Sequence, residues 1–113
     1  MKISVIIPTY NRCAILIRTL FSAEAQTFSK NKFEIIVVDD GSNDNTRIAV
    51  ENFIKGSNLN IRYFFQNHLG PARARNLGID NSKGDILLFC GDDTIFDEKL
   101  IENHYKIHQQ EKN

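Results

Sequence analysis

The strongest constraint on the fold is a regular alternation between short apolar runs and longer segments with helical periodicity. The runs rich in Ile, Val, Leu and Phe are residues 3–7, 34–38 and 86–90, and a fourth at 61–65 also carries an Arg. Runs that are apolar on both faces are typical of central strands in a parallel sheet, because helices cover both sides of such sheets. The pattern therefore predicts an α/β fold with a mostly parallel sheet.

Helical periodicity follows each of these runs. The predicted helices cover residues 13–26, 44–55 and 71–79, and a last helix follows Asp97. Asn11 and Ser42 are candidate N-caps of the first two helices, and Pro71 occupies a favoured first helical position. Strands and helices in strict alternation predict right-handed crossovers with helices on both faces of the sheet. In such sheets, ligands bind beyond the carboxyl ends of the strands.

Length and charge restrict the possible classes of function. The 113 residues leave room for one domain, and 14 Lys and Arg residues balance 14 Asp and Glu residues, so the positive field that nucleic-acid binding needs is missing. No apolar stretch approaches the roughly 20 residues of a membrane span, and residues 1–7 do not resemble a signal peptide. Cys13 and Cys90 lack metal-ligand spacing and predict two reduced thiols. We therefore expect a cytoplasmic location, with no nucleic-acid partner and no membrane span.

Polar clusters follow three of the predicted strands, at the edge where a ligand would bind. They are residues 8–11 (Pro-Thr-Tyr-Asn), 39–42 (Asp-Asp-Gly-Ser) and 91–94 (Gly-Asp-Asp-Thr). Adjacent carboxylates repel one another unless a cation, an amide or a ligand hydroxyl compensates their charge. For residues 39–42, a turn followed by a helix cap is an equally good interpretation. For Asp92 and Asp93, the alternative is an exposed turn, but we favour hard oxygen ligands for Mg²⁺ or Mn²⁺.

Four segments together resemble the successive signatures of family 2 glycosyltransferases with the GT-A fold. They are ISVIIPTYN at 3–11, IVVDDGS at 36–42, GPARARNLG at 70–78 and FCGDD at 89–93. The resemblance covers nearly the whole chain, and four motifs in the right order are far more specific than any one of them. It implies a Rossmann-like, nucleotide-sugar-binding half of a GT-A fold, occupying residues 1–113 as a single domain.

The resemblance implies a nucleotide-diphospho-sugar donor, most often a UDP-sugar. Pro8, Thr9 and Tyr10 would supply backbone contacts and an aromatic wall for the base, because a base offers an apolar face for stacking. Asp40 corresponds to the base-reading acid and would accept the ring N–H of uracil. Asp39 would tune the turn or reach the ribose.

The resemblance also implies a divalent ion, Mn²⁺ or Mg²⁺. Asp92 would contact the ribose or a metal-bound water, and Asp93 would ligate the ion that bridges the diphosphate. Many family members have a third acid in this motif, whereas Gly91 and Thr94 flank the pair here. We therefore expect weak metal binding without nucleotide. Of the arginines that follow the third predicted helix start, Arg73 is the candidate donor contact.

In the resembling family, the acceptor site and the catalytic base follow the Asp-Asp motif. The base is expected beyond Asn113, so the catalytic residues are unknown and the domain is expected to be truncated before the acceptor-binding half. The expected reaction is inverting transfer of the sugar to a carbohydrate or lipid-linked acceptor hydroxyl, as in polysaccharide biosynthesis, in the cytoplasm or peripherally at the inner face of the membrane. The alternative is a non-catalytic nucleotide-sugar-binding module or assembly subunit. An open sheet edge also predicts self-association.

Overall fold

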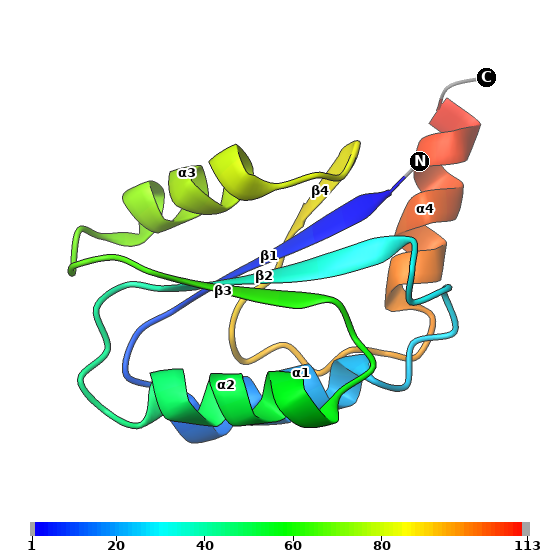
Figure 1. Cartoon of the computed structure of the whole chain (residues 1–113). Helices are drawn as coiled ribbons and strands as arrows, with labels where there is room; N and C mark the ends of the chain where they lie inside the picture. The colour runs from blue at the N-terminus through cyan, green and yellow to red at the C-terminus, as the bar shows by residue number, and fades with distance from the viewer. Residues whose placement is uncertain (1, 112–113) are drawn as a thin grey trace.

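The computed structural model describes residues 2–111, in which strands and helices alternate strictly (Figure 1). Every predicted strand and helix is present. The elements are β1 (Ile3–Thr9), α1 (Cys13–Ala23), β2 (Phe33–Asp39), α2 (Thr46–Gly56), β3 (Ile61–Phe65), α3 (Pro71–Asn81), β4 (Ile86–Phe89) and α4 (Leu100–Glu111). The predicted α/β class is therefore confirmed, including the strand at 61–65 that carries Arg62.

The described strands form one parallel sheet in the order β3-β2-β1-β4. The central strands β1 and β2 are almost completely buried, as their apolar runs predicted. The prediction of a central strand at 86–90 is wrong, because β4 lies at the edge of the described sheet and Leu87 and Phe89 on it are exposed. Thr9 lies opposite Asp39, and Asp39 lies opposite Phe65. The ends of three neighbouring strands therefore coincide, and the loops that follow them lie side by side.

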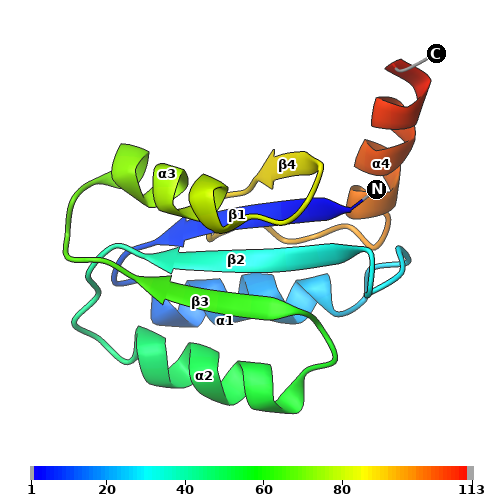
Figure 2. The same ribbon diagram turned by 45° about the horizontal axis from the view of Figure 1, so that its top comes forward.

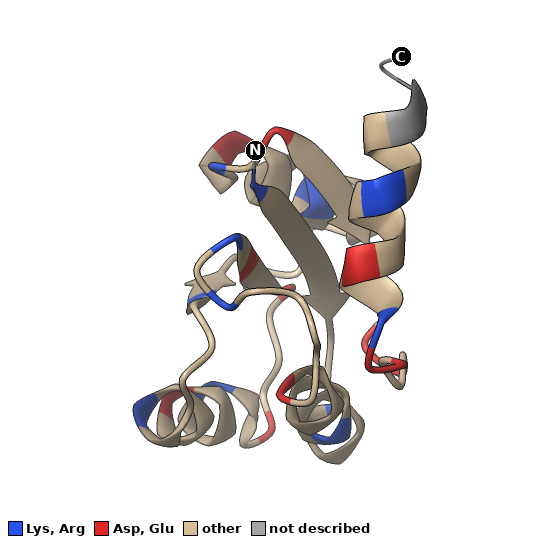
Figure 3. Ribbon diagram, turned by 90° about the vertical axis from the view of Figure 1, so that its right-hand side faces the viewer, with Lys and Arg blue, Asp and Glu red and all other residues tan. Residues whose placement is uncertain are grey.

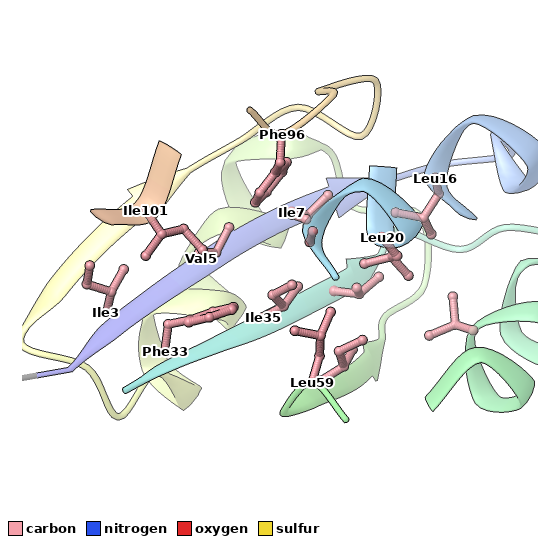
Figure 4. Packing of buried hydrophobic residues seen from close by; sticks show 14 of the residues in the cluster. Ile3, Val5, Ile7, Leu16, Leu20, Phe33, Ile35, Leu59, Phe96 and Ile101 are labelled. Carbon is pink, nitrogen blue, oxygen red and sulfur yellow. The ribbon is translucent and has the colours of Figure 1, made fainter. Parts of the chain in front are cut away.

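The helices cover both faces of the sheet. Figures 1 and 2 show α1 and α2 against one face and α3 against the other. The larger core lies on the α1 side and contains side chains from β1, β2, α1 and α4, among them Val5, Ile35, Leu20 and Ile101 (Figure 4). A smaller core lies on the α3 side, where Ala74 packs against the sheet.

Two predicted helix caps are wrong. Arg12 and Asn45 precede α1 and α2, and neither helix has a side-chain cap hydrogen bond. Asn11 and Ser42 instead join two loops, because the Asn11 amide donates to Ser42 Oγ at 2.8 Å and Asn11 Oδ1 accepts from the Asn43 amide at 2.9 Å. These contacts join segments about thirty residues apart, whereas the prediction considered only local helix signals.

A buried polar network lies on the α3 side of the sheet. The Glu34 carboxylate accepts hydrogen bonds from Ser4 Oγ at 2.6 Å and from the Lys83 amide at 2.7 Å. Arg62 donates to it through Nε at 3.2 Å and Nη2 at 2.8 Å, and also donates to the Asn81 carbonyl. Burial would raise the pKa of Glu34, but these hydrogen bonds and the Arg62 charge lower it below its usual value of 4.5. The network joins β1, β2 and β3 to the end of α3.

Charge is mixed over the surface, and Figure 3 shows acidic and basic segments on helices on both sides of the sheet. Within residues 2–111, no helix is long and apolar enough to cross a membrane. Cys13 and Cys90 are free thiols. Leu87 and Phe89 are exposed on the edge strand β4, and the self-association expected from an open edge stays a prediction.

Candidate nucleotide-sugar site

A hollow with a volume of about 360 Å³ lies beyond the carboxyl ends of β1, β2 and β4, where a doubly wound sheet binds ligands. Its lining comes from the loops after four strands and from the start of α3. The lining residues are Pro8, Thr9, Tyr10, Arg12, Asp40, His68, Pro71, Ala74 and Asp92. The segments around residues 8–10, 40, 71 and 92 are distant in sequence, and the parallel sheet brings them together.

Asp40 is the most heavily hydrogen-bonded acid of the site. Its Oδ1 accepts from the Leu69 amide and from Gln66 Nε2, both at 2.8 Å, and its Oδ2 accepts from the Gly70 amide at 3.1 Å. Burial would raise the pKa of Asp40, but the hydrogen bonds and the nearby His68 lower it below 3.8. Asp40 is therefore ionised at neutral pH and is held as a hydrogen-bond acceptor in the wall of the hollow.

Tyr10 and His68 form a stacked pair at the mouth of the hollow. Their ring centroids are 4.2 Å apart with an interplanar angle of 28°. His68 Nδ1 lies 3.0 Å from the Asp40 carbonyl oxygen and 3.1 Å from Asp40 Oδ2. Gly41 makes room for this arrangement, because it has φ +89° and a Cβ there would lie 2.7 Å from the His68 amide nitrogen.

Asp92 and Asp93 follow β4 and differ strongly in exposure. The Asp92 side chain is 12% exposed and that of Asp93 is 70% exposed. Asp92 Oδ2 accepts from Thr9 Oγ1 at 2.9 Å, and the Asp92 carbonyl accepts from Thr19 Oγ1 at 2.6 Å. Arg12 Nε lies 3.2 Å from Asp92 Oδ1, and Arg12 Nη2 lies 3.8 Å from Asp93 Oδ2. The acidic pair is thus anchored through Asp92, and the single positive charge of Arg12 compensates part of its charge.

The carboxylate oxygens at this edge fit a hard divalent cation that is bound partly by the protein and partly by a phosphate group. Among the described residues, no group of three or more His, Cys, Asp or Glu side chains could hold a metal ion. Two adjacent carboxylates remain, and Mg²⁺ is usually held by one or two carboxylates together with water and substrate phosphates. Asp92 and Asp93 would supply only part of the ligands of such an ion, and weak binding without nucleotide stays a prediction.

Asp39 lies behind the wall of the hollow. It is fully buried, its Oδ1 accepts from the Ser42 amide at 2.9 Å, and its Oδ2 accepts from Tyr63 Oη at 2.6 Å. Of the two roles predicted for Asp39, this geometry supports the turn. A ribose contact would require the fully buried Asp39 side chain to become accessible from the hollow.

The predicted donor contact Arg73 is exposed on α3, whereas Pro71 and Ala74 are the α3 residues that line the hollow. Its role stays a prediction. Sequence reasoning overlooked Arg12 and assigned no role to His68 in its polar loop, yet both residues line the hollow. Their positions in the sequence could have indicated both residues, because each lies in a loop at the same sheet edge as the predicted acids. Only the structure shows which side chains they contact.

Comparison with known proteins assigns the family. The model of glycosyl transferase family 2 matches residues 4–113, which is almost the whole chain. The chain belongs to glycosyl transferase family 2. Two curated relatives are poly(ribitol-phosphate) β-N-acetylglucosaminyltransferase TarS of Staphylococcus aureus, 35% identical over 103 residues, and validoxylamine A glucosyltransferase of Streptomyces hygroscopicus subsp. jinggangensis, 38% identical over 108 residues.

Solved glycosyltransferase structures confirm the predicted GT-A fold. S. aureus TarS 1-349 in complex with UDP-GlcNAc superposes with a TM-score of 0.84 at 33% identity, and covers 97% of this family 2 chain. Mannosyltransferase PcManGT from Pyrobaculum calidifontis, in complex with GDP-Man and Mn²⁺, superposes with a TM-score of 0.89 at 26% identity over 93% of the chain. The match covers 32% and 31% of these two structures.

The family 2 chain is shorter than its relatives. The alignment with TarS includes 91% of this chain and 18% of TarS. The alignment with validoxylamine A glucosyltransferase includes 94% of this chain and 25% of that enzyme. The comparisons therefore concern one part of these longer enzymes.

Proposed function

We propose that this chain is the donor-binding part of an inverting glycosyltransferase that uses a UDP-sugar and a divalent metal ion. The observation that carries the proposal is the hollow at the sheet edge, where Tyr10, Asp40 and Asp92 meet. Support also comes from the relatives, since TarS is described in complex with UDP-GlcNAc and PcManGT with GDP-Man and Mn²⁺. Mn²⁺ and Mg²⁺ favour the same oxygen ligands, and we propose Mn²⁺ as the first ion to test.

The base of the nucleotide is proposed to bind between the Pro8–Tyr10 segment and Asp40. Asp40 is ionised and is held by backbone amides, so it offers a fixed acceptor to the N–H of a uracil ring. Tyr10 is 41% exposed, and the face of its ring that does not stack on His68 offers an apolar surface for a base. A fixed, ionised acceptor selects a base with a donor at that position, because a base that presented a lone pair there would be repelled by the carboxylate.

The diphosphate is proposed to lie toward Asp92 and Asp93. A divalent ion at this pair would neutralise the charge that develops on the leaving diphosphate. Asp92 is held by Thr9 Oγ1, so its carboxylate keeps one orientation as the donor binds. Arg73 stays a proposed contact, since it lies in the sequence of α3 between Pro71 and Ala74, which line the hollow, and is itself exposed.

In the proposed reaction, the oxygen of an acceptor hydroxyl forms a bond to the anomeric carbon. The bond from that carbon to the diphosphate breaks, the nucleoside diphosphate leaves with the electron pair, and the hydroxyl proton passes to a base. Asp40 and Asp92 are engaged in the donor site, so we propose that the base and the acceptor site belong to a further part of the enzyme. The acceptor is proposed to be a carbohydrate or a lipid-linked carbohydrate.

The proposal is tested by calorimetric titration of UDP into the chain with and without Mn²⁺. Asp93→Ala removes the exposed acid of the pair, and Asp80→Ala removes an exposed acid on α3 as a matched control. UDP is expected to bind with Mn²⁺ and to lose at least about tenfold in affinity in Asp93→Ala, while Asp80→Ala binds as the wild type does. CDP and GDP are titrated in parallel. CDP is expected to bind more weakly, because N3 of cytosine carries no hydrogen and cannot donate to Asp40, whereas GDP tests whether guanine, which has its own N–H donors, is accepted.

A folded wild-type chain that fails to bind UDP in the presence of Mn²⁺ would contradict the proposal. Tighter binding of GDP than of UDP would overturn the choice of uracil and keep the nucleotide-sugar site. If UDP-sugar binds but is neither hydrolysed nor transferred by the chain, the result agrees with a donor-binding part that lacks its base. That outcome also fits a non-catalytic nucleotide-sugar-binding module.

A further inference from the structure

Arg12 lies beside the proposed metal-binding acids and has no role in the proposed binding of the donor. It lines the hollow and approaches both acids of the pair, with Nε 3.2 Å from Asp92 Oδ1 and Nη2 3.8 Å from Asp93 Oδ2. Its guanidinium therefore stands next to the two carboxylate oxygens that a divalent ion at this pair would use.

The backbone around Arg12 is held in place. The Asn11 amide donates to Ser42 Oγ at 2.8 Å, and the Cys13 amide donates to Asp44 Oδ2 at 3.4 Å. Both neighbours of Arg12 are therefore fixed to the loop between β2 and α2. The Arg12 side chain is 45% exposed, so it can change its rotamer while the backbone stays in place.

The two oxygens of Asp92 have different partners. Oδ2 accepts the Thr9 hydroxyl at 2.9 Å from within the protein, and Oδ1 faces Arg12. A divalent ion bound by Asp92 Oδ1 and Asp93 would lie close to the guanidinium. The divalent ion and the guanidinium would repel each other at this short separation, and both would compete for the lone pairs of Asp92 Oδ1.

We propose that Arg12 is a resident counter-cation of the Asp92–Asp93 pair and that it has to move away before a divalent ion binds there. Without nucleotide, displacing Arg12 from the two carboxylates would reduce the net free energy of metal binding. With the diphosphate of the donor present, two further negative charges offset this cost and give the displaced guanidinium another anion to contact. Arg12 thus makes metal binding depend on the nucleotide. This inference rests on the proposed function of the acidic pair.

The test is a titration of Mn²⁺ alone, without nucleotide, followed by the electron paramagnetic resonance signal of free Mn²⁺. Arg12→Gln removes the charge, Arg12→Met removes it with a different side chain, and Arg12→Lys keeps it. Arg18→Gln is the matched control, because Arg18 is exposed on α1. Both neutral variants are expected to bind Mn²⁺ about three- to tenfold more tightly than the wild type, as expected from removing a like charge at a solvent-exposed site.

Arg12→Lys and Arg18→Gln are expected to stay within about twofold of the wild type. Adding Asp93→Ala to Arg12→Gln is expected to abolish the gain, which places the extra binding at the acidic pair. Equal or weaker Mn²⁺ binding in both neutral variants would overturn the inference. So would a gain that survives Asp93→Ala, or the absence of Mn²⁺ binding in all variants at millimolar concentration.

A second readout is the coupling between metal and nucleotide. The ratio of Mn²⁺ affinities with and without UDP is expected to be smaller in Arg12→Gln than in the wild type, because part of the cost that UDP offsets has been removed. The two proposals fail separately. If UDP does not bind, the proposed function fails while the titration of Mn²⁺ alone still decides the role of Arg12.

Discussion

Glu34 provides a quantitative test of the polar network that joins three strands to the end of α3. Its carboxylate is 7% exposed and accepts from Ser4, from the Lys83 amide and twice from Arg62. Glu34→Ala leaves all these donors without their acceptor. Breaking a buried charged pair from one side costs about 3–5 kcal/mol, and the 27% exposure of Arg62 places the expectation near the lower value, about 3 kcal/mol.

The assay is urea unfolding followed by circular dichroism. With a slope of about 1.5 kcal/mol per molar urea, a loss of about 3 kcal/mol lowers the midpoint by roughly 2 M. Glu34→Gln keeps the shape and one acceptor but loses the charge, so we expect about 1–2 kcal/mol. Glu51→Gln, at an exposed position on α2, is the control and is expected to change stability by less than about 0.5 kcal/mol.

The pH dependence of the free energy of unfolding is an independent test of whether the ionised form of Glu34 stabilises the fold. The pKa of Glu34 is lower in the folded chain than its usual value of 4.5, so the ionised carboxylate stabilises the fold above that value. This contribution is lost as the pH falls through the folded pKa. The difference between wild type and Glu34→Gln should therefore be complete at pH 7 and should shrink as the pH falls below 4.5. A difference of the same size at pH 7 and pH 3, or a loss below about 1 kcal/mol in Glu34→Ala, would refute the reasoning.

Two further predictions concern the site and the thiols. Gly41→Ala is expected to destabilise the chain by at least about 2 kcal/mol in urea unfolding and to weaken UDP binding, since φ is +89° and the new Cβ would meet the His68 amide; unchanged stability would contradict the close approach of the two loops. Burial raises the pKa of Cys90 to about 11, so in a Cys13→Ser background iodoacetamide at pH 8 should label the folded chain at least about tenfold more slowly than the urea-unfolded chain. Equal labelling rates would show that Cys90 is not protected.

Much of the fold could be read from local sequence patterns. The apolar runs and the helical periodicity predicted each described strand and helix. Burial on both faces explains the continuous apolar runs of β1 and β2, whereas the similar run of β4 lies on an edge strand, a position that local sequence did not reveal. The same patterns located the sheet edge, and the acids Asp40 and Asp92 lie there as expected. The helix caps were predicted wrongly at Asn11 and Ser42, because their actual partners are on each other's loops.

The sequence by itself thus determined the α/β class, the edge that carries the site and the family of glycosyltransferases. Only the tertiary structure decided the partners: Arg12 with Asp92, His68 with Tyr10 and Asp40, and Glu34 with Arg62. These pairs depend on the strand order β3-β2-β1-β4 and on the register between strands. Periodicity along the chain reports which face of an element is buried, and it carries no information about which distant side chain lies opposite.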